Sequence, residues 1–449
     1  MTPARPAPRT RSGTRVRVVS RAPAAGRASS APLRLGGVPL SAALPALRAV
    51  EPLARACWLY DLDAFESRTR RFFAAFAELE PAVAYALKAN ALPALVERAR
   101  SLQLLAEAGS LGELEVALVA GYAPGAMVLN GNGRTSEEAD WVARWGAALV
   151  NADHLGELDL LERAAAGANA RLRVALRVNP DIRTRGHRYV ATGGRDSKFG
   201  IAPREALEVW IARRHWPHLT LDALHVHVGS QVAETGPLEA ALEVALELAA
   251  ESARRGAPLA LLNLGGGFGV DYGGAGEEFP IERWGVRVTK RVRGTPYRWM
   301  FEPGRWLIAP AGVLLAEVLA VKQRGKRRFV VLAAGMNDLI RPALYGAMHR
   351  MAPLIPRAGR RSSATVVGPV CESADVFGVA ELPPVVPGDV IAILEAGAYG
   401  ASMASNYNGR GRLAELVASG GRLVRARASE RPEDLVRGRR SDELPLRDL

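Results

Sequence analysis

Lys88 is the residue whose type and position most directly suggest covalent chemistry. Only five of the 59 basic residues in this chain are lysines, and the rest are arginines. Lys88 follows the apolar run 82–87. A lysine in such a place can lose its proton and attack a carbonyl group, whereas arginine stays protonated. The alternative is a lysine that extends from a strand end and keeps its charge in water.

Two further apolar runs carry polar side chains that could share a site with Lys88. His225 and His227 alternate along one run, so both would face the same side of a strand, and Ser230 follows a glycine just beyond. Glu302 ends the last such run. Taken singly, His227 could be a core histidine with satisfied hydrogen bonds, and Glu302 could be an ordinary turn carboxylate.

Three consecutive glycines follow another run, at Gly265, Gly266 and Gly267. Glycine allows positive φ and close backbone approach, so this segment could form a nest of N–H groups for an anion, or only a tight turn. Its spacing differs from the dinucleotide-binding fingerprint. An amine, a flat ring, a phosphate nest and a carboxylate are together the parts that pyridoxal phosphate requires.

The elements that must position these residues alternate regularly between residues 57 and 305. This alternation predicts a parallel (β/α)8 barrel, whose active site lies at the carboxyl ends of the strands. Periodicity alone does not distinguish a closed barrel from an open doubly wound sheet. The predicted strands are 83–87, 102–107, 127–130, 147–152, 172–178, 221–228, 259–264 and 298–302, and amphipathic stretches include 62–79, 111–120, 203–213 and 237–255.

After residue 305 the pattern changes to short β-rich runs separated by glycine and proline turns, at 313–321, 329–333, 365–370 and 390–394. These runs predict a second, mainly β domain built from residues 306–430, to which we add residues 35–56. Residues 1–34 form an Arg/Pro/Ala-rich leader that we expect to be disordered. Residues 431–449 form a charged tail.

The net charge of +13 arises mainly at the amino terminus. Residues 1–50 contain nine arginines and no acidic residue. We therefore infer no nucleic-acid binding from the charge. The leader could be an organelle transit peptide or an overlong start of the reading frame. No apolar run is long enough to cross a membrane, and we predict no metal site. Two cysteines suit a reducing compartment, and we expect a cytoplasmic protein.

A resemblance to a known family covers roughly residues 35–435. The chain resembles the fold-type III pyridoxal-phosphate decarboxylases, and most closely the diaminopimelate decarboxylase family. The motifs that carry the resemblance are YALK88AN, S110LGEL, N130GNG, T192 to SKFGI201, H225VHVGSQ, GGGFG269, E302PGR, R341PALY345, GPVC371ES and GAY399 through NYNG409. The resemblance implies an alanine-racemase-like barrel followed by a C-terminal β-barrel.

The resemblance also implies cofactor contacts. Lys88 would hold pyridoxal 5′-phosphate covalently, and His227 would stack on its ring. Glu302 would pair with the protonated pyridine nitrogen, which favours decarboxylation, because alanine racemases of similar fold place arginine there. The remaining implied contacts, several of them to the phosphate, are Ser230, Gly265, Gly266, Gly267, Pro303, Gly304, Arg305 and Tyr399.

The resemblance implies catalytic and substrate residues as well. Cys371 would return a proton to the substrate across a homodimer interface. Arg305, Arg341, Tyr345, Glu372 and Tyr399 would bind the far end of the substrate. The implied reaction converts meso-2,6-diaminopimelate into L-lysine and CO2.

Departures from the family pattern leave alternatives open. The usual Thr-Pro opening of the first barrel strand reads Ala56-Cys-Trp-Leu, and segment 183–189 is rich in arginine. A related decarboxylase acting on a D-amino acid, a carboxylated polyamine or a siderophore precursor is therefore a second reading. A non-catalytic homologue that binds the cofactor is a third.

Overall fold

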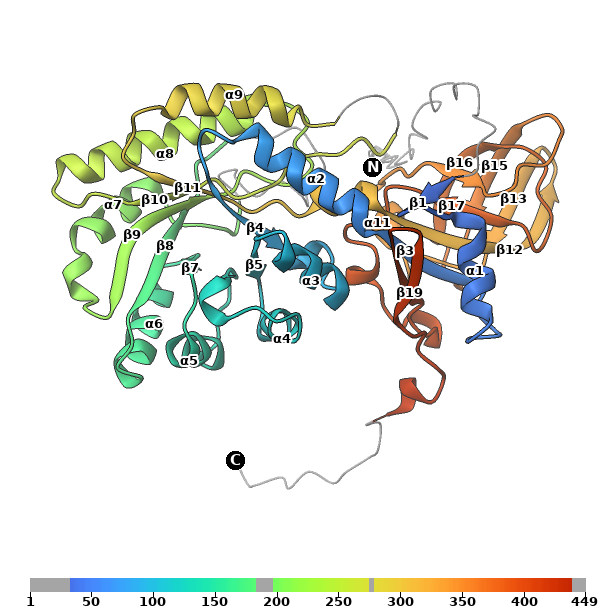
Figure 1. Ribbon diagram of the computed structural model, residues 1–449, viewed down its shortest axis with the longest axis horizontal. Helices are drawn as coiled ribbons and strands as arrows, with labels where there is room; N and C mark the ends of the chain where they lie inside the picture. Colours follow the sequence, from blue (N-terminus) through green and yellow to red (C-terminus); the bar gives the residue numbers. More distant parts are fainter. Residues whose placement is uncertain (1–32, 183–196, 274–277, 438–449) are drawn as a thin grey trace, which may run out of the picture. The chain divides into compact units, whose positions relative to one another are not determined.

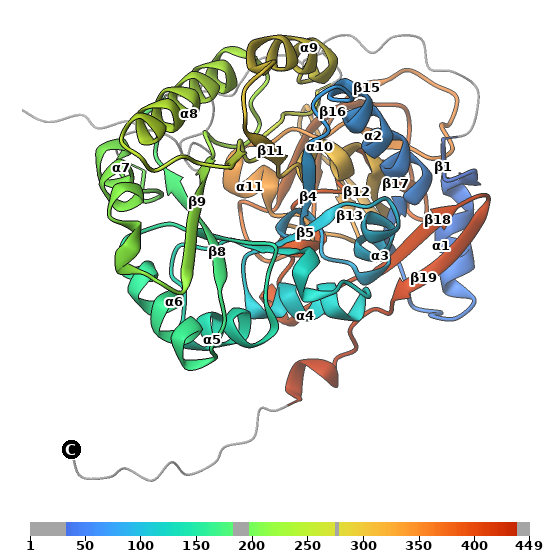
Figure 2. The same ribbon diagram turned by 60° about the vertical axis from the view of Figure 1, so that its left-hand side comes forward.

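Eight parallel strands close into a barrel in the computed structural model, which describes residues 33–182, 197–273 and 278–437 (Figures 1 and 2). Neighbouring strands pair in chain order, and β11 pairs with β4, which closes the ring. The predicted (β/α)8 architecture is confirmed, and the barrel is closed rather than open. The strands are β4 (Ala82–Ala86), β5 (Leu105–Ala108), β6 (Met127–Leu129), β7 (Leu149–Ala152), β8 (Leu172–Val178), β9 (Leu219–Val226), β10 (Leu261–Asn263) and β11 (Arg298–Phe301).

Helices alternate with these strands and cover the outside of the barrel (Figure 2). Their starts follow local signals. Thr135 caps α5 in a capping box with Glu138, and Asp61 caps α2 by accepting the N–H of Ala64. The helices are α2 (Leu62–Ala75), α3 (Pro93–Ser101), α4 (Leu111–Val119), α5 (Ser136–Trp145), α6 (Gly156–Gly167), α7 (Pro203–Ile211), α8 (Gly236–Arg254) and α9 (Ile281–Val292).

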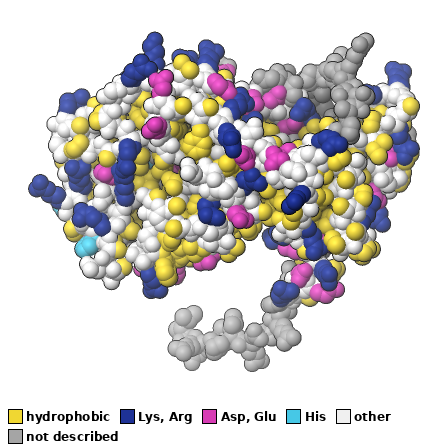
Figure 3. Space-filling model, in the orientation of Figure 1, with side chains coloured by type: hydrophobic (Ala, Val, Ile, Leu, Met, Phe, Trp, Pro, Cys, Tyr) yellow, Lys and Arg dark blue, Asp and Glu magenta, His cyan; other side chains and the backbone are white. Residues whose placement is uncertain are grey.

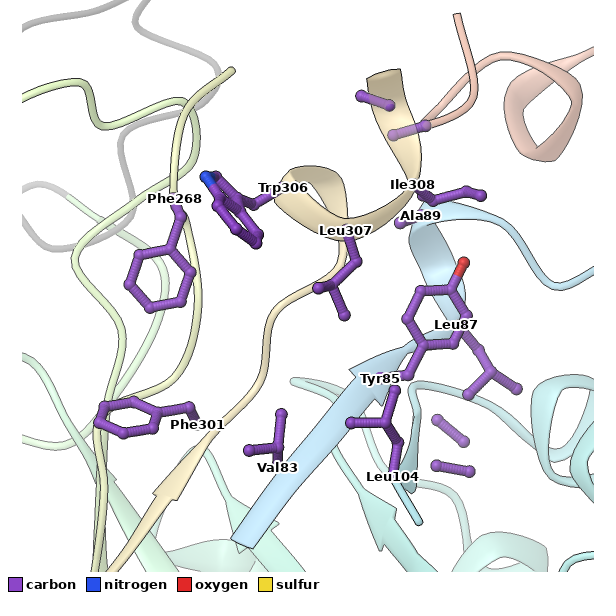
Figure 4. Close-up of a cluster of buried hydrophobic side chains, with 14 of the residues drawn as sticks. Val83, Tyr85, Leu87, Ala89, Leu104, Phe268, Phe301, Trp306, Leu307 and Ile308 are labelled. Atoms are coloured by element: carbon purple, nitrogen blue, oxygen red, sulfur yellow. The ribbon is translucent and has the colours of Figure 1, made fainter. Parts of the chain in front are cut away.

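A buried apolar cluster supports the end of β4 and the 3₁₀ turn after it, η1 (Leu87–Ala89), which carries Lys88 (Figure 4). In this cluster, side chains of β4 and η1 pack with those of β11 and the short helix α10 (Arg305–Ile308). Gly304 is required here, because a Cβ atom at this position would lie 2.9 Å from the Cβ of Ala86. The turn that carries Lys88 is thus fixed by close packing.

The second sheet has nine strands and receives segments from both ends of the chain. The β-rich runs predicted after residue 305 are confirmed. Its strands are β3 (Ala56–Asp61), β12 (Gly312–Arg324), β13 (Arg327–Leu332), β14 (Met351–Pro353), β15 (Ser362–Val367), β16 (Val376–Leu382), β17 (Val390–Ile393), β18 (Ala414–Ser419) and β19 (Arg422–Arg427). The short strands β1 (Arg34–Leu35) and β2 (Val38–Pro39) pair with each other, and α1 (Leu40–Arg48) follows them.

The boundary between the two regions differs from the prediction. The predicted barrel began at residue 57, and Ala56-Cys-Trp-Leu stood at the place where the family's first barrel strand opens. In the structure β3 instead pairs with β12 and β18 of the second sheet. Every residue of β3 is buried, and such a strand shows no alternation that could assign it to one sheet or the other. Hydrogen bonds also join the two regions, including Asn90 Nδ2 to Gly397 O at 3.1 Å.

Several predictions concern residues outside the described ranges. The predictions concern three segments. They are the leader 1–34, of which only the last two residues are described, the end of the tail beyond residue 437, and the motif around Thr192 with the arginine-rich segment 183–189. None of the helices in the described ranges combines the length and apolarity that a membrane crossing requires. On the face drawn in Figure 3, Lys and Arg side chains are spread among acidic and apolar ones.

Candidate active site

Lys88 lies at the carboxyl end of β4, where the sequence predicted it. Its Nζ atom is 3.1 Å from Glu107 Oε2 on β5 and 3.2 Å from Oε1. Burial would lower the pKa of Lys88, but Glu107, Tyr399 and Glu302 together outweigh it and the pKa is raised. Even so, 48% of the Lys88 side chain is exposed, because it projects into an open part of the barrel mouth. The carboxylate of Glu107 therefore stabilises the protonated amine, and the side chain is still accessible to a ligand.

Glu302 follows β11 and receives donors from three other strands. Asn263 Nδ2 and Asn151 Nδ2 donate to Oε1 at 2.7 and 3.0 Å, and Asn130 Nδ2 donates to Oε2 at 3.1 Å. His225 Nε2 lies 3.3 Å from Oε2. Burial alone would raise the pKa of Glu302, but these partners hold it well below its usual range. The carboxylate is thus a fixed negative charge at the centre of the barrel mouth.

His227 lies against the glycine run. Its Nδ1 accepts the N–H of Gly266 at 3.2 Å, so that a neutral ring carries its proton on Nε2. Burial, together with the charges of Arg177 and Lys88, lowers the pKa of His227 well below the ordinary value. The ring is therefore neutral and keeps one orientation.

The three glycines are each required by a close backbone approach. A Cβ atom on Gly266 would lie 2.1 Å from Glu302 O, and one on Gly267 would lie 2.0 Å from Gly229 O. Gly265 and Gly267 also adopt positive φ angles of 63° and 95°. The run therefore lets its backbone lie directly against the ends of β9 and β11, and the N–H groups of Gly265 and Gly266 donate to Asn263 Oδ1 and His227 Nδ1.

Arg305 is 7% exposed, and its hydrogen bonds within the described ranges go to neutral groups. It donates to Ser230 Oγ at 2.9 and 3.2 Å and to Tyr272 OH at 2.7 Å. Its Cζ atom lies 4.5 Å from the ring centroid of Tyr399. The expected group of Ser230, Arg305 and Tyr399 is thus brought together.

Arg341 begins α11 (Arg341–Tyr345) and is 4% exposed. Its Cζ atom lies 4.1 Å from the ring centroid of Tyr272, and its Nη1 lies 2.7 Å from His349 Nε2. Burial lowers the pKa of Arg341 to about 10, which leaves it charged at neutral pH. Across the described ranges, no carboxylate forms an ion pair with Arg341 or with Arg305. Two buried cations thus lie near one aromatic ring, with no carboxylate partner among the described residues.

Tyr399 reaches the barrel from the second sheet region. Its backbone N–H donates to Ala89 O at 2.8 Å, directly beside Lys88, and its φ angle is 56°. A tyrosine at positive φ is strained, and such strain is retained where surrounding contacts impose it. The contact joins the predicted Tyr399 to the predicted Lys88.

Cys371 and Glu372 are not brought to this group. Both are exposed. The Cys371 N–H donates to Asn408 Oδ1 at 2.8 Å, and Tyr407 OH lies 3.5 Å from Glu372 Oε2. In the part of the chain that the structure describes, no hydrogen bond or ion pair connects them to the barrel mouth.

Sequence reasoning missed several residues that complete the site. Glu107, Asn151, Asn263, Tyr272 and His349 contact predicted site residues directly. Four of them had a usable signal, because Glu107, Asn151 and Asn263 lie in or at the ends of predicted barrel strands and His349 follows the RPALY motif. Tyr272 had no such signal.

The side chains brought together at the barrel mouth fit pyridoxal 5′-phosphate. An accessible amine, a fixed carboxylate and a neutral imidazole beside a glycine-rich turn are chemical groups that this cofactor uses. A family model described as "Pyridoxal-dependent decarboxylase, pyridoxal binding domain" matches residues 62–309. Fold and site thus define the class: the chain is one of the pyridoxal-dependent decarboxylases.

Comparison with individual relatives identifies one family within this class of decarboxylases. The chain is 37% identical over 386 residues to a diaminopimelate decarboxylase of Zymomonas mobilis, covering 85% of this chain and 91% of that protein. The crystal structure of diaminopimelate decarboxylase from Helicobacter pylori complexed with L-lysine is 34% identical, with a TM-score of 0.82, and the match covers 87% of this chain and 98% of that one. The chain belongs to the diaminopimelate decarboxylase family, whose members are carboxy-lyases.

A more distant solved structure shares only the fold. It is a lysine/ornithine decarboxylase from Vibrio vulnificus complexed with cadaverine, at 21% identity and a TM-score of 0.73, covering 83% of this chain and 97% of that one.

Proposed function

We propose that the protein decarboxylates meso-2,6-diaminopimelate to L-lysine and CO2 with pyridoxal 5′-phosphate as its cofactor. The observation that carries the proposal is the pair of buried guanidinium groups, Arg305 and Arg341, without a carboxylate partner among the described residues. A buried charge without a counter-charge is costly, and a ligand carboxylate would relieve that cost through charge-assisted hydrogen bonds. Diaminopimelate carries such a carboxylate at the end remote from the reacting carbon, and it remains in the product L-lysine, whereas ornithine and lysine as substrates carry only the carboxylate that would leave.

The protein's own residues would divide the work between them. Lys88 would hold the cofactor through its amine, and Glu302 would keep a proton on the pyridine nitrogen because its own pKa is low. When bound, the cofactor supplies an electron sink for the pair released as CO2 leaves. His227 would lie against the ring, and the Gly265–Gly267 turn with Ser230 would bind the phosphate.

Charged side chains would bind the end of the substrate that is remote from the reacting carbon. Arg305 and Arg341 would bind the remote carboxylate, with Tyr345 beside them. Tyr399, held against Ala89 by its backbone, would close the site between the cofactor and the substrate.

The site would be completed in a homodimer. Cys371 and Glu372 are exposed, and exposed apolar side chains lie in the same region of the second domain, including Met348 (61%), Val379 (60%), Leu344 and Val376. α11 and β16, which contact each other, flank this apolar surface. We propose that it packs on a second copy and delivers Cys371, as the donor of a proton to the substrate carbon, and Glu372, as the partner of the remote ammonium group, to the partner's barrel mouth.

The substrate is tested by measuring CO2 release from meso-diaminopimelate, lysine, ornithine and arginine with the holoenzyme. We expect release from diaminopimelate, and little from the three amino acids that lack the remote carboxylate. Release from ornithine or arginine with none from diaminopimelate would show that the roles given to Arg341 and Glu372 are wrong.

The cofactor and the shared site have separate tests. Borohydride should fix a near-visible chromophore onto Lys88, and absence of both colour and label would reject the cofactor assignment. Mixing Lys88→Ala chains with Cys371→Ala chains should restore part of the activity that each lacks alone. No recovery in a mixture proven to contain mixed dimers would reject the homodimeric site.

A further inference from the structure

His349 lies directly behind Arg341 and has one possible hydrogen-bonding pattern. Its Nδ1 is 2.9 Å from Leu394 O and its Nε2 is 2.7 Å from Arg341 Nη1. A carbonyl oxygen only accepts and a guanidinium group only donates. Nδ1 therefore carries the proton and donates to Leu394, while Nε2 accepts from Arg341. This pattern belongs to a neutral imidazole.

The surroundings keep the ring neutral. His349 is 6% exposed, and burial together with the charge of Arg341 lowers its pKa to about 3. Protonation would put a positive charge on Nε2 against Arg341. The ring therefore holds the guanidinium group in place at neutral pH without cancelling its charge.

Tyr272 completes the arrangement on the other side. Its ring meets His349 edge to face, with centroids 5.1 Å apart, and lies 4.1 Å from Arg341 Cζ. Its hydroxyl accepts from Arg305 Nη1 at 2.7 Å. Both arginines are thus positioned by neutral groups, whereas many other arginines of the chain pair with Asp or Glu, as Arg350 does with Glu395.

We propose that His349 is a positioning residue that sets the specificity of this site for substrates with a remote carboxylate. By accepting one N–H it aims Arg341, and by staying neutral it leaves the positive charge for the ligand. An Asp or Glu at this place would aim the guanidinium group equally well but cancel the charge. The inference rests on the proposed function, because it concerns the carboxylate assigned above to Arg341.

The test compares two ligands that differ only in that carboxylate. L-lysine carries it and cadaverine, 1,5-diaminopentane, does not. In the holoenzyme of His349→Leu, L-lysine should bind about 10–100-fold more weakly, the range expected for losing a well-aimed hydrogen bond to a charged group, while cadaverine binding stays within about twofold. The KM for diaminopimelate should rise by a similar factor, with kcat changed much less.

Two further variants separate positioning from folding. His349→Gln can accept from Arg341 and donate to Leu394, so it should recover most of the L-lysine affinity. His349→Glu keeps the acceptor but adds a negative charge, so it should lose L-lysine binding at least as strongly as His349→Leu. Val424→Leu, at an exposed position on β19 away from the proposed dimer surface, is the control for cofactor absorbance, unfolding temperature and kinetics.

Three results would overturn the inference. They are equal weakening of both ligands in His349→Leu, unchanged L-lysine binding in His349→Leu, or unchanged L-lysine binding in His349→Glu. The last of these decides the matter even if the leucine variant fails to fold. A wild-type protein that neither prefers L-lysine to cadaverine nor acts on diaminopimelate would instead reject the proposed function. A wild type that does both, with unaffected His349 variants, would reject only the role of His349.

Discussion

Two regions of the barrel mouth differ in the partners that surround their buried charged groups. Around Glu302, three asparagine amides donate to one carboxylate and His225 lies beside it, so both carboxylate oxygens have partners inside the protein. Around Arg305 and Arg341, the partners are a serine, a tyrosine and a neutral histidine. The carboxylate of the first region has its partners within the chain, whereas in the ranges that the structure describes no carboxylate pairs with the two arginines of the second. The difference indicates which region serves the cofactor and which one selects the substrate.

The largest effect should follow from removing the compensated charge. In Glu302→Gln, one carboxylate oxygen becomes an NH2 group that faces the asparagine donors. The neutral amide also lacks the negative charge that keeps a proton on the pyridine nitrogen. We expect kcat for diaminopimelate to fall by about 10²–10³-fold or more. Glu243→Gln on the exposed face of α8 is the matched control. If the Glu302 variant keeps a third of wild-type activity, the carboxylate is not the electrostatic centre of the site.

The uncompensated region should respond selectively. Arg341→Lys removes the fork that can bind a carboxylate at two points, and kcat/KM for diaminopimelate should fall by about 10–100-fold. Steady-state kinetics with diaminopimelate report on the end of the site that binds the remote carboxylate. Inhibition by cadaverine, which has no carboxylate, reports on the rest of the site and should be unchanged. Arg291→Lys, on the surface of α9, should change neither. Equal losses for both ligands would mean that Arg341 only braces the fold.

A smaller effect tests the link between Lys88 and Glu107. The pKa of Lys88 is raised mainly by Glu107, so Glu107→Gln should lower it. We expect the pH at which Lys88 is half-labelled by an amine reagent in the cofactor-free protein to fall by about 1–3 units. Mass spectrometry measures the labelling, with Lys290 on α9 as an internal control. An unchanged profile would show that Glu107 does not hold the proton on Lys88.

The smallest effect concerns a third buried charge, outside both regions. Asp338, in the second domain, is 2% exposed and accepts one N–H from Gly335 through Oδ2. Burial raises its pKa to about 7, in contrast to Glu302, which has four partners. The folded state therefore binds more protons than the unfolded state between about pH 4 and pH 7, and stability falls as the pH rises through this window.

Asp338→Asn should remove that dependence. At pH 8 the variant should be more stable than wild type, by a few kcal/mol at most in the free energy of unfolding, and should unfold at a higher temperature. The difference in stability should vanish near pH 4. Thermal unfolding followed at several pH values measures this. Ser363→Ala, on the exposed part of β15, is the control. A difference that does not depend on pH would mean that Asp338 is not protonated in the native state.

The sequence predicted the parts of the site that follow strand ends. Lys88, His227 and Glu302 ended apolar runs, and a closed barrel brings all such ends together, so their convergence followed from topology. The compensation of Glu302 could not be predicted. It depends on which side chains point inward from β6, β7 and β10, and a run of apolar residues with one asparagine does not reveal its direction.

The contacts that Tyr272 and His349 make with the arginines could not be predicted for a different reason, although His349 follows the RPALY motif. Tyr272 and His349 lie in irregular segments, whose geometry is set by contacts rather than by periodicity. β3 was assigned to the barrel because it stands just before it in the chain. Its true partners lie far away in the sequence, and pairing at such distances leaves no local signal.

The position of β3 also governs how the protein can be made. The ribosome releases this buried strand before the barrel, while Val313, which lies opposite Leu59, follows only after the whole barrel has been synthesised. At roughly 5–20 residues per second, the wait is on the order of ten seconds or more. Throughout that interval an apolar strand with open edges precedes a folding barrel, which makes it a natural target for chaperones. A fragment that ends after the barrel would leave β3 without its partners permanently.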